Sequence, residues 1–528
     1  MLTFDNRFLR ELPGDPETAN TTRQVKGAMW SRVSPTPVAA PRLLAYSREV
    51  AADLGLSESS MQDLSMINAL GGNGRLPGSD PYATVYGGHQ FGNWAGQLGD
   101  GRAIYLGEAV SAAGKRHELQ LKGAGPTPYS RRADGRAVLR SSIREFLCSE
   151  AMHHLGIPTT RALSLVATGD KVVRDMFYDG RPEHEPGAIV CRVAPSFTRF
   201  GHFEIHAARN DVPLLKKLID FTIERDFADL TLPADPVERI GAWFAIIAER
   251  TAVMVAHWMR VGFVHGVMNT DNMSILGLTI DYGPYGWVDN FDAGWTPNTT
   301  DAEGRRYCYG RQPEIARWNL ERLASALMMV TDDDSADNRE LTDLLQLGMS
   351  KFDDAFDLAT RTNLAGKFGF AAWHEKDAAL VNDAFRLMSE AEVDMTIFFT
   401  RLADVGVDAT VNRVLMADAF YRDDLRKQHQ AQFDDWLGRY LSRLQEDDCA
   451  QADRAAMMGK FNPRFVLRNY LAQEVIDAAT QGDDSKVIEL LDVMRKPYEL
   501  QPGRERFAAK RPDWARQKAG CSMLSCSS

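Results

Sequence analysis

The 528-residue sequence predicts an α+β fold in which a small strand-rich unit precedes a larger helical unit. Short apolar segments separated by turns dominate residues 84–205, which is typical of strands. Apolar side chains at helical spacing dominate from about residue 210 onward. The composition, 44% hydrophobic and 25% charged, is that of a globular protein and supplies enough apolar side chains for a large core.

Residues 1–83 are expected to form an N-terminal extension of loops and one amphipathic helix. That helix begins near Pro41 and carries four apolar side chains at helical spacing, Leu43, Leu44, Val50 and Leu54. The run Gly71-Gly72-Asn73-Gly74 predicts a loop after it.

The strand-rich unit, residues 84–205, begins with two predicted strands over 103–108 and 118–122, joined by a turn at 111–114. A helix is predicted next over 137–155. Its apolar positions share one face: Val138, Ile143, Leu147 and Met152.

The two remaining regions are mostly helical. Residues 206–330 contain one strand-like interval around 274–289. Long amphipathic helices are expected from about 310 to 500, for example over 317–330 and 464–479, so that 331–528 form a helical C-terminal region.

Charge and cysteine usage exclude several classes of protein. Sixty-one basic against seventy-two acidic side chains give a net charge of −11, which argues against a nucleic-acid binder. Six cysteines without a C-x-x-C pair favour neither a disulfide framework nor a structural zinc site, and indicate a reducing compartment. The N-terminus lacks the features of a targeting signal, and the most apolar stretch, 242–259, is interrupted by Glu249 and Arg250. We therefore expect a cytoplasmic protein without a membrane span.

Three features of the strand-rich unit point to phosphate chemistry when taken together. The run Gly96-Gln97-Leu98-Gly99-Asp100-Gly101-Arg102 precedes a strand, and its glycines would let the backbone approach phosphate oxygens. Lys122 ends the following strand, where its ammonium group could reach a phosphate. Glu145 lies in the next helix and could pair with Lys122. Each has an ordinary structural explanation alone: a hairpin turn, a solvated lysine and an exposed glutamate.

The strongest motif is His265-Gly266-Val267-Met268-Asn269-Thr270-Asp271-Asn272, followed by Ile280-Asp281-Tyr282-Gly283. Protein kinases use His-Arg-Asp-x-x-x-x-Asn followed by Asp-Phe-Gly, and this sequence keeps the same register. The residues between Asn272 and Asp281 suffice for a short hairpin. An amide oxygen and a carboxylate would then meet on one divalent cation, and oxygen is the ligand atom that Mg²⁺ prefers. The ordered set predicts a kinase-like two-lobed fold, with lobes over 84–205 and 206–330.

Val267 stands where kinases place the catalytic aspartate, and a valine cannot accept a proton from a hydroxyl group. Three explanations remain open at this point. The protein is a catalytically inactive nucleotide-binding scaffold, a phosphotransferase with another base, or an enzyme that binds the nucleotide differently and transfers a different part of it. Asp271 is the nearest candidate for a replacement base.

Longer blocks of sequence resemble the selenoprotein O family, a group of protein adenylyltransferases with a pseudokinase fold. The blocks cover nearly the whole chain: 86–92, 99–102, 119–125, 192–201, 265–283 and 310–313, with Cys526-Ser527-Ser528 resembling the family's C-terminal end. Some members carry selenocysteine at this end, so this chain resembles a cysteine-containing member.

The resemblance implies transfer of AMP from ATP to Ser, Thr or Tyr hydroxyls of protein substrates, with release of pyrophosphate and with ATP inverted relative to kinases. Self-modification is a further expectation of ours, separate from the resemblance. Asp271 would be the proton acceptor, Glu145 would orient Lys122, and Mg²⁺ or Mn²⁺ would bind Asn272 and Asp281. The residues implied to contact ATP are Gly99, Gly101, Arg102, Lys122, Asp134, Gly135, Arg192, Arg199 and Asp281.

Two further expectations concern arginines and cysteines. Arg192 and Arg199 lie seven residues apart among apolar neighbours, and two guanidinium groups suit a buried phosphate tail. Some family members form a disulfide between the C-terminal cysteine and a cysteine after the metal-binding aspartate. Here residues 295–298 contain none. A Cys308–Cys526 bridge is one hypothesis, unpaired thiols are the other, and Cys521 adds a second C-terminal thiol.

Overall fold

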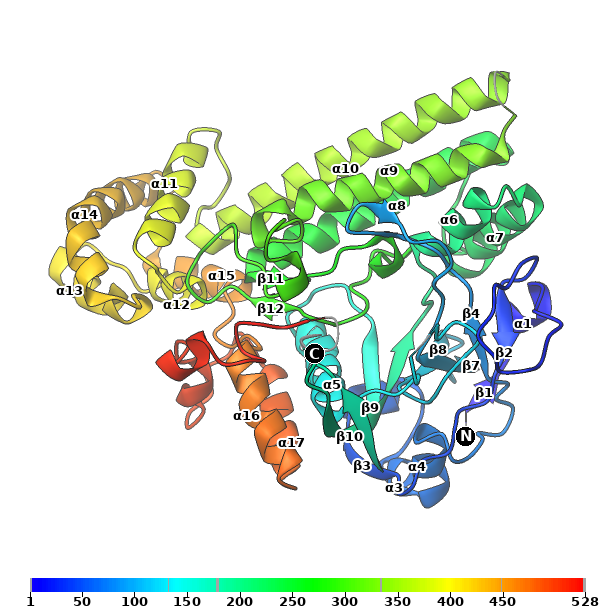
Figure 1. The fold of residues 1–528 in the computed structure, drawn as a ribbon. Coiled ribbons are helices and arrows are strands. Elements are labelled where there is room, and N and C mark those ends of the chain that lie inside the picture. The colour runs from blue at the N-terminus through cyan, green and yellow to red at the C-terminus, as the bar shows by residue number, and fades with distance from the viewer. Residues whose placement is uncertain (1, 132, 177–179, 333–334, 448, 526–528) are drawn as a thin grey trace.

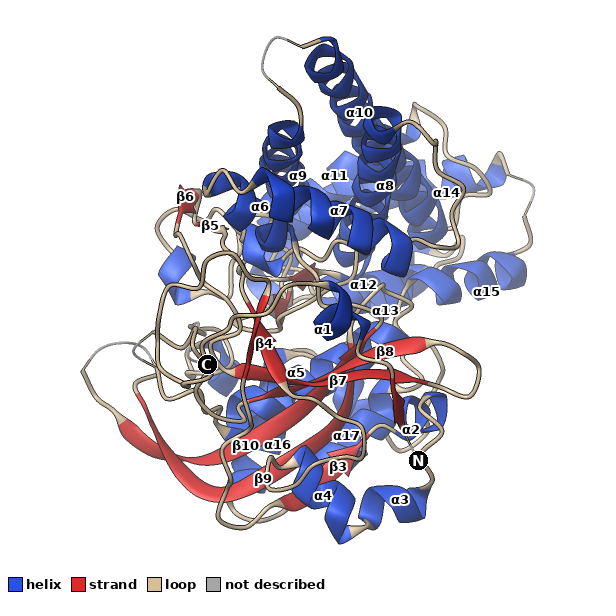
Figure 2. Cartoon of the chain, turned by 90° about the vertical axis from the view of Figure 1, so that its right-hand side faces the viewer, coloured by secondary structure: helices blue, strands red, loops and turns tan. Residues whose placement is uncertain are grey.

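The computed structural model describes residues 2–131, 133–176, 180–332, 335–447 and 449–525. The terminal Cys526-Ser527-Ser528, on which part of the sequence interpretation depends, lies outside this range. A mostly β half and a mostly helical half lie side by side (Figures 1 and 2). The predicted α+β class and the order of its two units are therefore confirmed.

An antiparallel eight-stranded sheet forms the β half, in the order β2-β4-β7-β8-β10-β9-β3, with β1 paired to β7. Its strands are β1 (Thr3–Phe4), β2 (Trp30–Arg32), β3 (Arg42–Tyr46), β4 (Tyr82–Thr84), β7 (Ala103–Val110), β8 (Arg116–Lys122), β9 (Arg161–Arg174) and β10 (Glu183–Ala194). The two strands predicted over 103–108 and 118–122 are confirmed as β7 and β8, which pair with each other through a turn that includes Gly114.

The N-terminal segment is part of this sheet, because four of its strands come from residues 3–84. Short helices connect them: α1 (Arg7–Glu11), α2 (Arg48–Asp53), α3 (Glu58–Gln62) and α4 (Leu64–Leu70). The loop predicted at 71–74 follows α4. The expected division at residues 83 and 84 falls inside β4, and that at 205 and 206 falls inside α6 (Phe200–Ala208).

The helix predicted to begin near Pro41 is wrong in its first half. Residues 42–46 form β3, which pairs with β9, so pairing with the sheet overrides the helical spacing of the leucines. The helix α2 begins only after Ser47, whose side chain accepts a hydrogen bond from the Val50 N–H and caps the helix.

The predicted helix over 137–155 is confirmed as α5 (Leu139–His154). It packs against β9 and β10, and Ile143, Leu147 and Met152 are fully buried. Leu155 is the C-cap of the helix, and Gly156 follows with a φ of +74°, a conformation that glycine adopts without strain.

The helical half is built around α8 (Pro236–Val261), which packs against α9 (Gln312–Leu327) and α10 (Ala336–Phe368). α6 and α7 (Val212–Asp226) complete it. By length and composition α8 could cross a membrane, in spite of Glu249 and Arg250, but 61% of its apolar window is buried inside the protein. Trp243, Phe244 and Trp258 lie in the main core, so α8 serves here as a core helix.

The strand-like interval predicted at 274–289 is mostly irregular. Only β12 (Gly286–Trp287) forms, paired to β11 (Phe263–Val264). Ile275 and Ile280 are fully buried and attach this segment to the core. Gly277 and the Gly283-Pro284 pair interrupt regular strand geometry. The motif residues before it form a short 3₁₀ turn over Thr270–Asn272.

Seven helices complete the described C-terminal region: α11 (Asp377–Glu390), α12 (Met395–Leu402), α13 (Ala409–Met416), α14 (Asp423–Gln445), α15 (Gln451–Phe461), α16 (Asn469–Thr480) and α17 (Ser485–Met494). Helices α11 to α14 enclose a second core that includes Phe398, Trp436 and Tyr440, at the left of Figure 1. α16 and α17 instead pack on α5.

The two helices predicted over 317–330 and 464–479 are present with different bounds. α9 begins five residues earlier than predicted and ends at Leu327, where a 3₁₀ turn covers 328–330. α16 begins only at Asn469, because the preceding Arg468 is buried in ion pairs with Asp289 and Asp394 and its ψ of 142° is not helical.

Candidate active site

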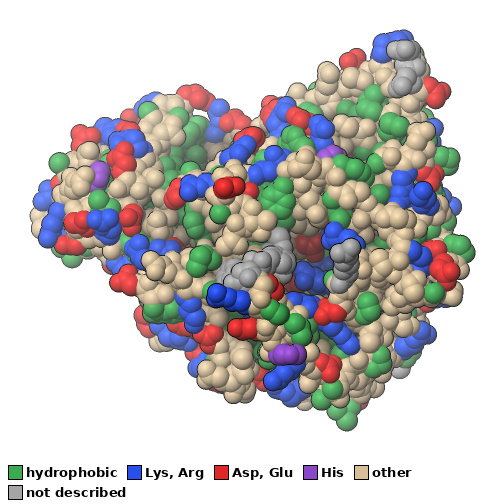
Figure 3. Space-filling view, viewed as in Figure 1, with side chains coloured by type: hydrophobic (Ala, Val, Ile, Leu, Met, Phe, Trp, Pro, Cys, Tyr) green, Lys and Arg blue, Asp and Glu red, His purple; other side chains and the backbone are tan. Residues whose placement is uncertain are grey.

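A cleft of about 750 Å³ is lined by residues of both halves. In Figure 3, basic and acidic side chains gather in a hollow near the centre of the face shown. Ten residues singled out from the sequence line the cleft: Gly99, Gly101, Arg102, Lys122, Asp134, Gly135, Arg192, Asp271, Asn272 and Asp281. Glu145 and Arg199 are buried behind this surface and bond to residues that line it.

Lys122 and Glu145 form the ion pair expected from the sequence. β8 ends at Lys122, α5 carries Glu145, and the lysine Nζ lies 2.8 Å from the glutamate Oε2. Burial lowers the pKa of Lys122, and the charge of Glu145 opposes this effect. The glutamate thus fixes the ammonium group at the inner end of the cleft.

Arg192 and Arg199 both form ion pairs with Asp281. Arg192 projects from β10 and also lies 3.1 Å from Glu145, so the two acids and the arginine form one network. Arg199 precedes α6, and its Nη1 donates to the Asp271 carbonyl oxygen at 2.8 Å. Both arginines are at least 97% buried, so two guanidinium groups lie together at the buried end of the cleft.

The Asp281 carboxylate is held ionised at this position. Burial alone would raise its pKa, but the charges of Arg199 and Arg192 dominate and hold the pKa well below its usual range. Its backbone has a φ of +59°, which is rare for a residue with a side chain. Just before it, the Ile280 carbonyl oxygen is bonded to the His265 ring at 2.8 Å. Backbone strain of this kind is concentrated at functional sites.

Asn272 lies in the 3₁₀ turn beside the cleft. Its amide Nδ2 donates to the Val267 carbonyl oxygen at 2.9 Å, which leaves the amide oxygen as a possible cation ligand. Val267 itself also lines the cleft and contributes only an apolar side chain there.

Asp271 is a buried carboxyl group with one side-chain partner among the described residues. Gln90 Nε2 donates to its Oδ2 at 3.1 Å, and its Oδ1 has no partner there. Burial raises the pKa of Asp271 to about 7, while the bond from Gln90 and the charge of Arg199 act in the opposite direction. A carboxyl group with this pKa is matched to proton transfer near neutral pH.

The outer part of the cleft is formed by a loop that holds Asp134 and Gly135. Asp134 forms an ion pair with Arg174 on β9, with an N–O distance of 2.7 Å. Gly135 lies so close to Gly125 that an added Cβ would be 2.1 Å from the Gly125 carbonyl oxygen. Only glycine fits there.

The glycine-containing run at 96–102 is not the hairpin turn that its Asp-Gly pair alone suggested. It is a loop that enters β7, and the β7–β8 turn lies further along the chain. Asp100 is buried in this loop, where its Oδ2 accepts a hydrogen bond from the Thr84 N–H at 2.8 Å. At Gly99, with a φ of +95°, a side chain would collide with the Tyr129 ring.

Sequence reasoning did not single out several contacts of the site. Tyr86 stacks under the Arg199 guanidinium at 4.7 Å, and Gln120 accepts a hydrogen bond from Arg192 Nε at 2.9 Å. Gln90, described above, is a third. All three lie inside the sequence blocks at 86–92 and 119–125, but nothing in the residue types separated them from their neighbours.

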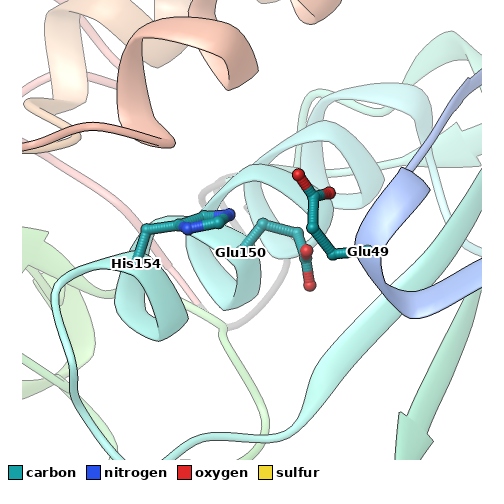
Figure 4. A group of neighbouring side chains, drawn as sticks. All are labelled: Glu49, Glu150 and His154. Atoms are coloured by element: carbon teal, nitrogen blue, oxygen red, sulfur yellow. The ribbon is translucent and has the colours of Figure 1, made fainter. Parts of the chain in front are cut away.

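A second group of possible metal ligands consists of Glu49 on α2 with Glu150 and His154 on α5 (Figure 4). Both carboxylates already have cationic partners, with Arg161 at 2.7 Å from Glu150 and Arg495 at 2.8 Å from Glu49. This pairing favours a structural role, in which the group anchors α5 to β9, α2 and the residue that follows α17.

The C-terminal segment lies against the chain that follows the Asp281 motif. The Leu524 N–H donates to the Pro297 carbonyl oxygen at 3.0 Å, and the Thr299 N–H donates to the Leu524 carbonyl oxygen at 2.7 Å. Among the described cysteines, Cys148, Cys191, Cys308 and Cys521 are buried and free, and Cys449 is exposed and free. The hypothetical Cys308–Cys526 bridge involves a residue outside the described range.

Comparison with known proteins adds independent findings. A family model described as "Protein adenylyltransferase SelO" matches residues 17–495. The chain is 63% identical to the "Protein nucleotidyltransferase YdiU" of Methylobacillus flagellatus, with 100% of both chains covered. Proteins of the same name from Tolumonas auensis and Azoarcus sp. are 62% and 61% identical, covering 100% of this chain and 99% of each relative.

Proposed function

Because the chain belongs to the SelO family of protein adenylyltransferases, and is thus a nucleotidyltransferase, we propose that it transfers AMP from ATP to Ser, Thr or Tyr hydroxyls of proteins. One observation carries this proposal. Lys122, Arg192, Arg199 and Asp281 converge at the buried end of a cleft in which the kinase base is replaced by Val267. We interpret the β half and the helical half as the two lobes of a kinase-like fold.

The distribution of charge supports an inverted ATP. The cationic side chains are concentrated at the buried end, where the β- and γ-phosphates would be most strongly bound. The nucleoside would then extend toward Asp134 and Gly135 at the more open end. This orientation turns the α-phosphate, rather than the γ-phosphate, toward the acceptor hydroxyl.

The reaction then assigns a role to each group. The acceptor oxygen attacks the α-phosphorus and forms the new O–P bond, while the bond to the oxygen bridging the α- and β-phosphates breaks and pyrophosphate leaves. Asp271 accepts the proton of the hydroxyl, and its raised pKa suits this step. Lys122 and the two arginines stabilise the negative charge of the leaving pyrophosphate.

The donor set fits a divalent cation. Asp281 and Asn272 both line the cleft, and carboxylate and amide oxygens are ligands that suit Mg²⁺ or Mn²⁺. Such a cation would neutralise phosphate charge when bound. Asp281 shares its oxygens with Arg192 and Arg199, and the same arginines would turn toward phosphate oxygens when ATP binds.

We also propose the partners of the protein and its location in the cytoplasm. Protein acceptors and ATP are the expected partners, self-modification is included, and neither nucleic acid nor membrane is needed. The net charge of −11 supports the exclusion of nucleic acid. Free thiols among the described cysteines are compatible with the cytoplasm.

One experiment separates the candidate activities. The protein is incubated with Mg²⁺ or Mn²⁺, a protein acceptor, and ATP labelled on either the α- or the γ-phosphate. We expect incorporation from the α-label alone. Incorporation from the γ-label alone would make the protein a phosphotransferase, and incorporation from neither, across a panel of acceptors and the chain itself, would favour a nucleotide-binding scaffold.

A further inference from the structure

The segment from Gly87 to Gly92 folds over the turn that carries Asp271. It contains β5 (His89–Gln90), which pairs with β6 (Asn93–Trp94). The His89 N–H donates to Thr270 Oγ1 at 2.7 Å. This bond ties the segment to the residue directly before Asp271.

Further contacts fix the conformation of this segment. The His89 ring lies 2.6 Å from the Glu204 carboxylate of α6, and the Phe91 N–H donates to the Tyr307 hydroxyl at 2.9 Å. Phe91 has a φ of +51° and Gly92 a φ of +84°, so the chain reverses direction directly after Gln90. A left-handed residue with a bulky side chain is strained, and the surrounding contacts hold it in place.

This fixed turn points the Gln90 amide at Asp271. Its Nε2 donates to Asp271 Oδ2 at 3.1 Å, and no other side chain bonds to that carboxyl group in the described chain. The other oxygen, Oδ1, faces Gly88, where an added Cβ would lie 2.7 Å from it. Gly88 therefore closes one side of the carboxyl group, and Gln90 determines its rotation.

We propose that Gln90 is a positioning residue for catalysis, whose amide fixes the Asp271 carboxyl group so that Oδ2 faces the acceptor hydroxyl. The inference rests on the proposed function, in which Asp271 accepts that proton. A carboxylate oxygen has two lone pairs, so Oδ2 accepts the bond from Gln90 and still binds the hydroxyl. Gln90 and Asp271 both line the cleft, whereas Gly88 does not, which places the reactive side at Oδ2.

The test uses Gln90→Met, which keeps the length of the side chain and removes the donor. We expect the turnover number for AMP transfer at saturating ATP to fall about tenfold to a hundredfold, the range for one hydrogen bond to a charged group. The affinity for a non-hydrolysable ATP analogue with Mg²⁺ and the melting temperature should match those of the parent. Gln62→Met, at an exposed position on α3, is the matched control and should leave all three quantities unchanged.

The same substitution is repeated in an Asp271→Asn background. Because Gln90 acts through Asp271, its removal should cause no further loss of the residual rate there. Gln90→Asn, whose amide is one methylene too short to reach Oδ2, provides a second variant and should also lower turnover.

Four results would overturn the proposal: unchanged turnover, increased turnover, an equal loss in the Asp271→Asn background, or a parallel loss of analogue binding. Increased turnover would show that Gln90 blocks the acceptor position. The proposed function has a separate test. If the parent protein incorporates no α-label, the AMP-transfer proposal fails regardless of Gln90. If it incorporates the label and the Gln90 variants do so equally well, only the positioning role fails.

Discussion

Replacing Glu145 by Gln tests whether the Lys122–Glu145–Arg192 network prepares the cleft for triphosphate. The substitution preserves shape and removes one buried negative charge. Lys122 Nζ and Arg192 Nη1 lie 2.8 Å and 3.1 Å from the two carboxylate oxygens, so both cations lose the charge of Glu145. Burial already lowers the pKa of Lys122, and loss of Glu145 lowers it further, so that less of the lysine is charged.

The distances set the size of the effect. At an effective dielectric constant of about 20, unit charges 2.8 Å apart attract by about 6 kcal/mol, and desolvation of the buried groups offsets much of this. Breaking a buried pair from one side typically costs about 3–5 kcal/mol. Asp281 still partners Arg192, so we expect the lower end, about 3 kcal/mol of unfolding free energy. The affinity for an ATP analogue should fall about tenfold, or 1.4 kcal/mol.

Denaturant unfolding and isothermal titration with the analogue and Mg²⁺ measure the two quantities. Glu249→Gln, at an exposed position on α8, is the control for loss of one negative charge. If Glu145→Gln changes stability by less than about 1 kcal/mol and leaves analogue affinity within about twofold, the network does not organise the cleft as described.

Three further outcomes are expected. Asp281→Asn should lower the rate of AMP transfer at least about a hundredfold and remove the Mg²⁺ dependence of ATP-analogue binding. If titrations show the same Mg²⁺ dependence as in the parent, Asp281 does not bind the metal. Asp271→Asn should lower turnover about 10²- to 10⁴-fold but spare analogue binding, so equal losses would argue against its role as base. Although partial burial opposes it, Arg495 holds the pKa of Glu49 at about 2, below the ordinary 4.5. Because the Glu49 side chain is 37% exposed, Glu49→Gln should lower the free energy of unfolding by at most about 1 kcal/mol at pH 7. In urea unfolding, the difference between parent and variant should shrink as the pH falls below about 4.5. A difference that stays constant would refute the link between the Glu49 pKa and stability.

Local sequence signals predicted the parts of the fold that depend on local chemistry. β7, β8 and α5 were predictable because alternation, turn residues and helical spacing agree there. β3 was not, because only its pairing with β9, more than 100 residues away, makes a strand of residues 42–46. The irregular conformation of the chain before Asp281 was equally unpredictable from the sequence, because it depends on contacts with other elements.

The site was predictable to a similar extent. The order of the motifs predicted four site residues, Lys122, Glu145, Asn272 and Asp281. In the structure all four lie in one cleft or directly behind it. Their catalytic roles remain predictions. The contact from Gln90 could not be foreseen, because it depends on a strained turn that places residue 90 beside residue 271.

The order of the strands in the sheet affects how the chain folds during its synthesis. β3 ends up beside β9, which the ribosome produces about 120 residues later. At a synthesis rate of about 5–20 residues per second, β3 stays unpaired for roughly 6–24 s before β9 is made. α5 waits longer for α16 and α17, which pack on it only when synthesis is nearly finished. Nascent chains of this protein therefore expose unpaired strand edges during translation, which makes them expected clients of ribosome-associated chaperones.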